Sequence, residues 1–291
     1  MAIDLKTRLE EGYTMGGLKH FTYLGTVTLI FGLALAFAAP RIKAQSFDIS
    51  LKFPPGENIG APQRTGGGGQ RGIACVTGKT RLTALTPMNN LTTTISSNPS
   101  LFWYIPPTQA QSADFLLVDE ENQEVYYYTQ IPLTQIPGIL EFKLPDHISL
   151  ATDTRYSWTL ALVCNPDDRS KDHVVRGLIQ RQPIQNGTTP PAELQTLLDA
   201  LVNQPERIKQ HLQDEASNYA KEMIWAETLM ILARLYQQFP NDSAIADEIQ
   251  ELLTSVELDN IPIECLVHSC AVETQDAQET QDAEAMREFK D

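Results

Sequence analysis

The stretch RYSWTLALVC, residues 155–164, decides the fold, because its large side chains recur at every second position. On an extended chain this alternation gathers them on one face: Tyr156, Trp158, Leu160, Leu162 and Cys164. The small and polar residues between them fall on the opposite face. A two-residue repeat of this kind predicts a half-buried β-strand. We interpret Trp158 as a core residue, with a platform for a ligand as the alternative.

Further segments have strand character, and Pro, Gly, Asn and Asp separate them: residues 47–53, 101–105, 114–118, 124–129, 139–144 and 173–181. Short strands at this spacing predict an antiparallel sandwich of the immunoglobulin-like type. No helical pattern alternates with these strands, which argues against a parallel α/β sheet. We therefore predict an all-β sandwich domain at residues 45–186, and an α+β protein once the following helices are included.

A pattern just before the central strand is typical of a tyrosine corner. Leu150, Asp153 and Tyr156 have the spacing L-x-x-D-x-x-Y. In immunoglobulin-like sandwiches the hydroxyl of such a tyrosine bonds to backbone a few residues upstream. The role predicted for these residues is structural.

The last third of the chain has helical spacing, and we predict a small helical region at residues 187–260. Thr189 before two prolines indicates a helix start. Further helices are expected from Pro205, over residues 217–239, and after a cap at Asp242 or Ser243. Such apolar helix faces are ordinarily core, and a peptide groove between helices is the alternative. Residues 261–291, with ETQDA twice, are expected to form a disordered acidic tail.

The beginning of the chain resembles a secretory leader. Residues 21–39, FTYLGTVTLIFGLALAFAA, carry no charge and lie between basic residues. This arrangement predicts a signal peptide over residues 1–44, cleaved after Ala44, with Met15 as an alternative start. An uncleaved membrane anchor is the alternative, because the run approaches the ~20 residues that span a bilayer. Either interpretation predicts an exported protein of the periplasm, cell envelope or extracellular space.

All four cysteines follow the leader, which agrees with an oxidising compartment. Four cysteines allow three pairings. We favour a structural disulfide between Cys75 and Cys164, since each lies in a strand-like segment of the sandwich; two buried thiols are the alternative. The state of Cys265 and Cys270 stays open.

The charge balance excludes one class of partner. The chain has 22 basic and 37 acidic residues, a net charge of −15. Nucleic-acid binders need clustered Lys and Arg to neutralise phosphates, so no nucleic-acid partner is expected. Membrane contact is expected only through an uncleaved leader.

Motif searches predict no catalytic residues, no cofactor and no metal site. Gly78-Lys79-Thr80 resembles the end of a phosphate-binding loop, but the glycine spacing is wrong and the next segment is strand-like. The polar run at residues 165–172 is interpreted as a turn in which Arg169 pairs with Asp neighbours, with a calcium site as the alternative. Cys265, His268 and Cys270 lack a fourth metal ligand at a suitable spacing.

Several segments, taken together, resemble one known family. They are FPPGENIGAPQRTGGGGQRG with Cys75, PSLFWYIP, RYSWTLALVCNPDDRSKD, VVRGLIQR and NYAKEMIWAETLMILARLYQQFPND. In this order they resemble the cyanobacterial family named domain of unknown function 928 over residues 47–260, whereas the tail after Leu258 departs from its pattern. The resemblance implies an exported protein of a photosynthetic bacterium and supplies neither an activity nor catalytic residues.

These observations favour an exported, non-enzymatic protein-interaction module. The expected partner is another envelope protein, and polysaccharide comes second. A secreted hydrolase acting on polysaccharide through carboxylates is the first alternative, because paired acids need no fixed sequence spacing. A purely structural wall component is the second.

Overall fold

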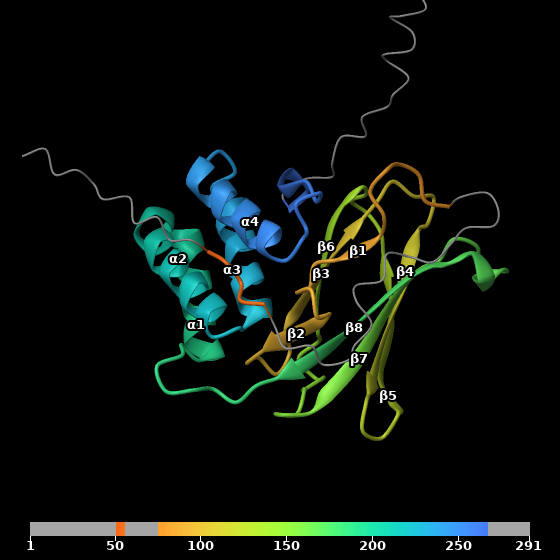
Figure 1. The fold of residues 1–291 in the computed structure, drawn as a ribbon, viewed down its shortest axis with the longest axis horizontal. Coiled ribbons are helices and arrows are strands. Elements are labelled where there is room, and N and C mark those ends of the chain that lie inside the picture. Colours follow the sequence, from red (N-terminus) through yellow and green to blue (C-terminus); the bar gives the residue numbers. More distant parts are fainter. Residues whose placement is uncertain (1–50, 56–74, 267–291) are drawn as a thin grey trace, which may run out of the picture. The chain divides into compact units, whose positions relative to one another are not determined.

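The computed structural model describes residues 51–55 and 75–266, and two β-sheets and four α-helices lie in this part of the chain (Figure 1). The strands are β1 (Thr83–Ala84), β2 (Leu91–Thr94), β3 (Ser100–Ile105), β4 (Ser112–Asp119), β5 (Glu124–Pro132), β6 (Gly138–Lys143), β7 (Arg155–Leu162) and β8 (His173–Arg181). The helices are α1 (Pro191–Asn203), α2 (Pro205–Lys221), α3 (Trp225–Gln238) and α4 (Ser243–Ser255). Two 3₁₀ turns, η1 (Arg169–Lys171) and η2 (Ile263–Leu266), complete the described elements. The predicted leader, the four glycines at 66–69 and residues 267–291 lie outside the described residues.

The strands form one sheet in the order β1-β3-β6 and another in the order β2-β8-β7-β4-β5. The α+β class predicted from the sequence is confirmed. The prediction of a wholly antiparallel arrangement was wrong, because β2 runs parallel to β8. β2 was not predicted as a strand, because LTTT lacks the two-residue alternation on which the prediction rested. The strands between β2 and β8 provide the long connection that a parallel pair requires.

The facing sides of the two sheets bury the residues that the sequence marked as core. Along β7 buried and partly buried positions alternate, as the RYSWTLALVC pattern predicts. The ring of Trp103 packs edge-on against Phe115 and Trp158, with centroids 5.8 and 5.4 Å apart. Trp103 and Trp158 are almost completely buried. The interpretation of Trp158 as a core residue therefore agrees with its position.

A disulfide joins Cys75 to Cys164, as predicted, and links positions 89 residues apart. Cys164 follows the end of β7, and Cys75 lies in a bend before an isolated bridge rather than in a strand. The bend is fixed by backbone bonds to the connection after β3: Thr77 N–H donates to Pro107, and Gln109 N–H donates to Cys75. Cys265 is also disulfide-bonded, to a partner outside the described residues.

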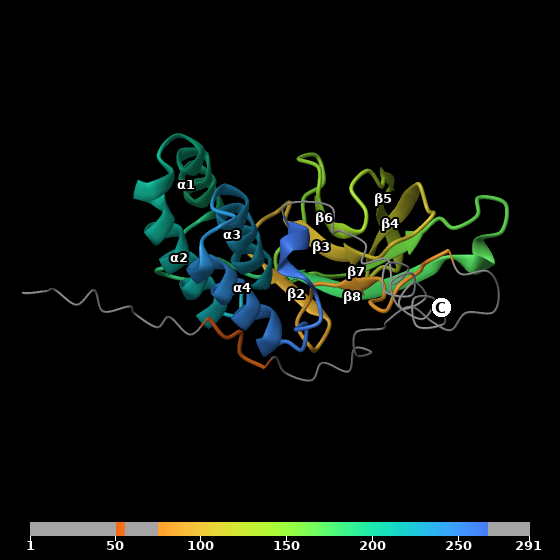
Figure 2. The same ribbon diagram turned by 90° about the horizontal axis from the view of Figure 1, so that it is seen from above.

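The helices cover the other side of the three-stranded sheet (Figure 2). In β3 the side chains of Leu101, Trp103 and Ile105 face the second sheet, whereas Phe102 and Tyr104 belong to the core shared with the helices. A strand buried on both faces requires a layer on each side. The β and helical parts therefore share a core, and the boundaries at 45–186 and 187–260 stay predictions.

Two predicted elements near this layer were wrong. The predicted helix over 217–239 is two helices, because Met223 adopts a left-handed conformation (φ 59°) and Ile224 N–H bonds back to Tyr219. This geometry ends a helix and is usually adopted by glycine, so a methionine at this position does not signal the break. Of the predicted strand at 47–53, residues 47–50 lie outside the described residues and residues 51–53 are irregular; the N–H groups of Leu51 and Phe53 donate to Glu251 and Ser255 of α4.

Within the described ranges, none of the helices combines the length and the apolar character needed to cross a bilayer.

Gly177 on β8 lies directly against the indole ring of Trp158 on β7. A Cβ added there would lie 2.3 Å from Cζ2 of Trp158 and 2.9 Å from Oδ1 of Asn90. We expect Gly177→Ala to lower the free energy of unfolding by ~1–3 kcal/mol, because the indole cannot move in a filled core. Urea denaturation measures this change. In a Trp158→Phe background, which removes the clashing edge, the same substitution should cost less; an equal cost in both backgrounds would show that the close approach is not its cause.

Candidate functional site

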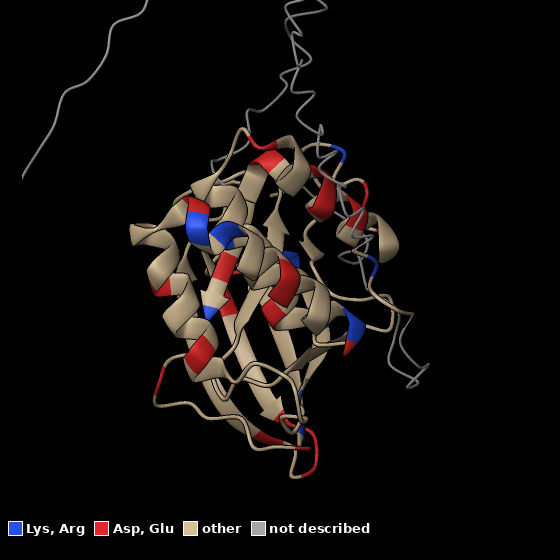
Figure 3. Cartoon of the chain, turned by 90° about the vertical axis from the view of Figure 1, so that its left-hand side faces the viewer, with Lys and Arg blue, Asp and Glu red and all other residues tan. Residues whose placement is uncertain are grey.

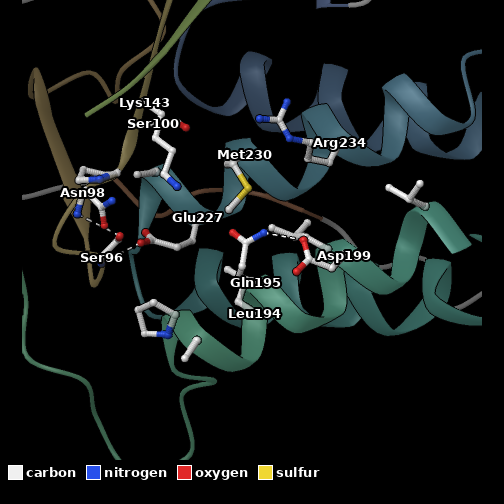
Figure 4. A pocket seen from close by; sticks show the side chains of 16 residues that line it. Ser96, Asn98, Ser100, Lys143, Leu194, Gln195, Asp199, Glu227, Met230 and Arg234 are labelled. Carbon is white, nitrogen blue, oxygen red and sulfur yellow. Dashed lines mark hydrogen bonds between the residues drawn. The ribbon is translucent and has the colours of Figure 1, made fainter. Parts of the chain in front are cut away.

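A solvent-open groove of about 560 Å³ lies where α1 and α3 meet the three-stranded sheet (Figure 4). The segment between β2 and β3 and the end of β6 form one wall, α1 forms the opposite wall, and α3 contributes to the floor. A volume of this size is in the range of ligand-binding pockets. The lining residues are Ser96, Asn98, Pro99, Ser100, Lys143, Pro191, Ala192, Leu194, Gln195, Leu198, Asp199, Val202, Ala226, Glu227, Met230 and Arg234.

The α1 wall follows from the spacing of its residues. Leu194, Leu198 and Val202 are four residues apart, which places them along one stripe of the helix. Leu194 is buried, whereas Val202 is 72% exposed at the end of the stripe. Gln195 and Asp199 lie beside this stripe and are joined by a 2.8 Å hydrogen bond from the amide to the carboxylate. The wall thus presents aliphatic surface next to a polar rim.

The α3 side brings a cation to the groove. Arg234 lies two helical turns beyond Ala226 and Glu227, with Met230 between them (Figure 4). Its guanidinium donates to Glu141 on β6 at 2.7 Å, and the Ser100 hydroxyl donates to the same carboxylate oxygen at 2.7 Å. This pairing fixes the arginine against the sheet.

Glu227 is the buried acid of the groove. It occupies the first turn of α3 and is 3% exposed. Its Oε1 accepts hydrogen bonds from the Thr94 hydroxyl at 2.7 Å and from the N–H groups of Ile95 and Ser96 at 3.2 and 3.0 Å. Within the part of the chain that the structure describes, Oε2 has no hydrogen-bond partner. Burial raises the pKa of Glu227, and the hydrogen bonds that it accepts offset that effect only in part.

Residues next to Glu227 and Thr94 also join the start of α3 to the end of β2, and we call this set of contacts the Glu227 junction. The Thr93 hydroxyl donates to the Met223 carbonyl and accepts from the N–H of Trp225. The indole N–H of Trp225 donates to Leu85 at 2.8 Å. The start of α3 is therefore fastened to the end of β2 by consecutive polar contacts. This junction holds one side of the groove in place.

The acids of raised pKa do not face each other. Burial raises the pKa of Glu248 on α4 as well, and that carboxylate accepts a hydrogen bond from Gln213 on α2. Of these two acids, Glu227 lines the groove and Glu248 does not. A carboxylate-dependent hydrolase needs two carboxyl groups across one cleft. Glu227 and Glu248 therefore do not form such a pair. The second carboxylate that lines the groove, Asp199, accepts a hydrogen bond from Gln195.

The residues that the sequence singled out lie elsewhere in the fold. The Tyr156 hydroxyl accepts a hydrogen bond from the backbone N–H of Ala151 at 3.1 Å, and Leu150 is buried nearby. Asp153 has a left-handed backbone (φ 62°), and its N–H donates to Arg181. These contacts hold the backbone in place just before β7 and at its start. None of them lines the groove.

The polar run at residues 165–172 is a charge-paired turn. Arg169 donates to Asp172 at 2.6 Å and to Asp114 on β4 at 2.7 Å. Lys171 pairs with Asp168. Over residues 51–55 and 75–266, no group of three or more His, Cys, Asp or Glu side chains is arranged to hold a metal ion. His268 and Cys270 lie outside these ranges.

Sequence reasoning considered a peptide groove between helices but missed the residues that form this one. Glu227 and Arg234 lie seven residues apart on α3, so helical spacing could have connected them, but Lys143 lies far from both in the chain and no spacing rule connects it to them. One signal was present: in WAETLMILARLY, Glu227 is an acid within a helix whose other positions are mostly apolar. Such an acid must be either exposed or hydrogen-bonded inside the core.

The Glu227 junction predicts a graded response to substitution. Glu227→Leu leaves three donors without their acceptor and should lower the free energy of unfolding by about 2–4 kcal/mol. Glu227→Gln keeps an acceptor oxygen at the same place and should cost less. Urea denaturation of both variants measures the difference. Equal losses would mean that the carboxyl acts by its volume alone.

The raised pKa of Glu227 also predicts a dependence on pH. Between the pKa of an unfolded glutamic acid, about 4.3, and the higher folded value, the folded chain holds more protons than the unfolded chain. Its stability therefore falls as the pH rises through that window. Relative to the Glu227→Gln variant, the unmodified protein should be less stable at pH 7 than at pH 4.5. Parallel stability curves for the two proteins would contradict this expectation.

Comparison with known proteins places the chain in a family. A search of the curated proteins finds no match. A solved structure of Astrotactin-2, described as a conserved vertebrate-specific and perforin-like membrane protein involved in neuronal development, is similar at 11% identity and a TM-score of 0.24, over 64% of this chain and 37% of that one. At that score the likeness carries no argument, and the chain spans well under half of that protein. A family model matches residues 66–266, a range that passes Leu258 and includes Cys265. The chain belongs to the family described as Domain of Unknown Function (DUF928).

Proposed function

We propose that this protein is exported to the periplasm, cell envelope or extracellular space. It acts there as a non-enzymatic protein-interaction module. The groove between α1, α3 and the sheet binds a segment of an envelope protein. The observation that carries this proposal is the groove itself, which is open, aliphatic along α1 and polar at its rim. We also propose that the two β-sheets form a sandwich of the immunoglobulin-like type.

The lining favours a peptide over a sugar. None of the residues that line the groove is aromatic. Sugar-binding sites gain much of their affinity from aromatic rings, whose faces supply large contact areas. Leucine and methionine surfaces, by contrast, accept apolar side chains of a peptide. An envelope protein is therefore the preferred partner, and polysaccharide is the second candidate.

The compartment rests on separate observations. Uncharged residues 21–39 support export. The Cys75–Cys164 disulfide supports an oxidising compartment, since such bonds are rare in the cytosol. The acidic character of the chain is visible on the helical side in Figure 3, where acidic residues outnumber basic ones, and such a surface repels anionic lipid.

Site-specific crosslinking tests the groove. A photo-crosslinking amino acid at Val202, in cells that naturally make the protein, should capture a protein partner, whereas the same group at Met88 should not. Both residues are exposed, at 72% and 43%, but Met88 lies outside the groove. With the captured partner purified, Val202→Glu and Leu198→Glu should weaken binding at least ~10-fold by placing a charge on the aliphatic stripe. Met88→Glu is the matched control, and equal effects at all three positions would refute the groove as the site.

Fractionation tests the compartment. The protein should be recovered outside the cytosol, and its intact mass should not change on alkylation unless a reductant is added first. Cleavage after Ala44 should be visible as the loss of residues 1–44, while an anchored protein would retain them. A cytosolic protein that alkylates without reduction would contradict export.

A further inference from the structure

Strand β5 closes one edge of the five-stranded sheet, on the side away from the helices (Figure 1). It pairs with β4, and no described residue pairs with its other side. Val125 is 65% exposed and Tyr128 is 56% exposed. An exposed edge strand offers unpaired N–H and C=O groups, which only another extended chain can satisfy in register.

The register of β4 and β5 shows which backbone groups are open. Leu133 N–H donates to Gln111, which makes this pair a hydrogen-bonded one. Bonded pairs recur at every second residue of an antiparallel ladder, so Ile131 and Thr129 also bond toward β4. The N–H and C=O groups of Tyr128 and Gln130 therefore point away from the sheet.

Both ends of this open edge are blocked. The pairing shifts so that Leu117 faces Tyr127 while Val118 faces Val125, which leaves Tyr126 as a bulge. At the other end, the backbone of Pro132 faces outward like that of Tyr128 and Gln130, but proline has no N–H to donate. Bulges and prolines are devices that limit edge pairing. The blocked ends restrict pairing to a short ladder and prevent a long one.

We propose that β5 pairs antiparallel with β5 of a second copy of this chain, around a two-fold axis at Thr129. In this register Tyr128 of each copy faces Gln130 of the other, and the two pairs exchange four hydrogen bonds, which satisfies every outward group of these residues. Thr129 of one copy faces Thr129 of the other, and Thr–Thr is a favourable cross-strand pair. A self-complementary patch of this kind gives a closed dimer rather than a fibre.

The charges along the hairpin select the antiparallel direction. The β4–β5 turn is acidic at Asp119, Glu120, Glu121 and Glu124, whereas residues 125–140 carry no charge. Antiparallel pairing places each acidic turn beside the uncharged end of the other copy. Parallel pairing would place the two acidic turns together, where like charges repel.

The short ladder predicts a weak dimer. Four hydrogen bonds and the side chains beside them bury much less surface than a permanent interface, so dissociation in the micromolar to millimolar range is expected. The dimer surface and the groove involve different residues, so this inference does not depend on the proposed function.

Sedimentation velocity of the full chain, purified in the form its cells accumulate and run at about 10–500 μM, tests the dimer. The unmodified protein should shift toward a dimer as concentration rises. Gln130→Pro removes one outward N–H while leaving the bonds to β4, and should weaken association at least ~10-fold. Gln130→Thr keeps that N–H and loses the same side-chain bond to Asp114, so it should associate normally.

A second variant keeps the test decisive if Gln130→Pro fails to fold. Tyr128→Lys places a charge on the open edge, as natural edge strands do, and should also leave a monomer. A protein that stays monomeric over the whole concentration range overturns the proposal. Association that survives both Gln130→Pro and Tyr128→Lys overturns it as well, because it would then use another surface.

Discussion

The fastening of α3 to the end of β2 is the constraint on which the rest of the structure depends. Strand β3 is buried on both faces, so the three-stranded sheet exposes a large apolar surface unless helices cover it. Apolar contact alone would allow the helices to slide, because the hydrophobic effect is not directional. Hydrogen bonds are directional, and Glu227, Thr93 and Thr94 provide them at the first turn of α3. Burying an acid there is costly unless donors meet it, which ties this side chain to one helix position.

The groove is a consequence of that placement. With α3 fixed on the sheet, α1 reaches the groove through Leu194 and Leu198 on its flank, while Val202 extends past the covered region. The ion pair of Arg234 with Glu141 ties the later turns of α3 to β6. Because both ends of α3 are held by contacts within the chain, the shape of the groove does not depend on a bound partner. A preformed site loses less conformational freedom on binding, which favours affinity from a modest surface.

The sequence predicted those parts of the fold that depend on local pattern. The alternation in β7, the turn residues between strands and the Asp242 cap of α4 each follow from neighbouring residues, and each is present. The break at Met223 was missed because a left-handed methionine is stabilised by its surroundings and has no signal of its own. Strand β2 was missed, together with its parallel direction, because LTTT has no two-residue alternation and all four of its residues are buried. The groove was foreseen as an alternative only, since Lys143 and the residues of α1 meet Glu227 and Arg234 of α3 through tertiary packing.

The layout also places the proposed groove contact and the proposed β5 contact on separate surfaces. Helices cover one side of the three-stranded sheet and bring the groove to that region, while the five-stranded sheet runs from β2, which contacts α3, to β5. Among the residues that the structure describes, none pairs with the outer edge of β5. A sheet edge in solvent is a hazard when it is long, and the bulge at Tyr126 with Pro132 shortens it to two outward residues. A chain that only needed to avoid aggregation could have placed a lysine at Tyr128; exposed tyrosine there instead adds contact area to a short ladder, as expected of a weak and specific contact.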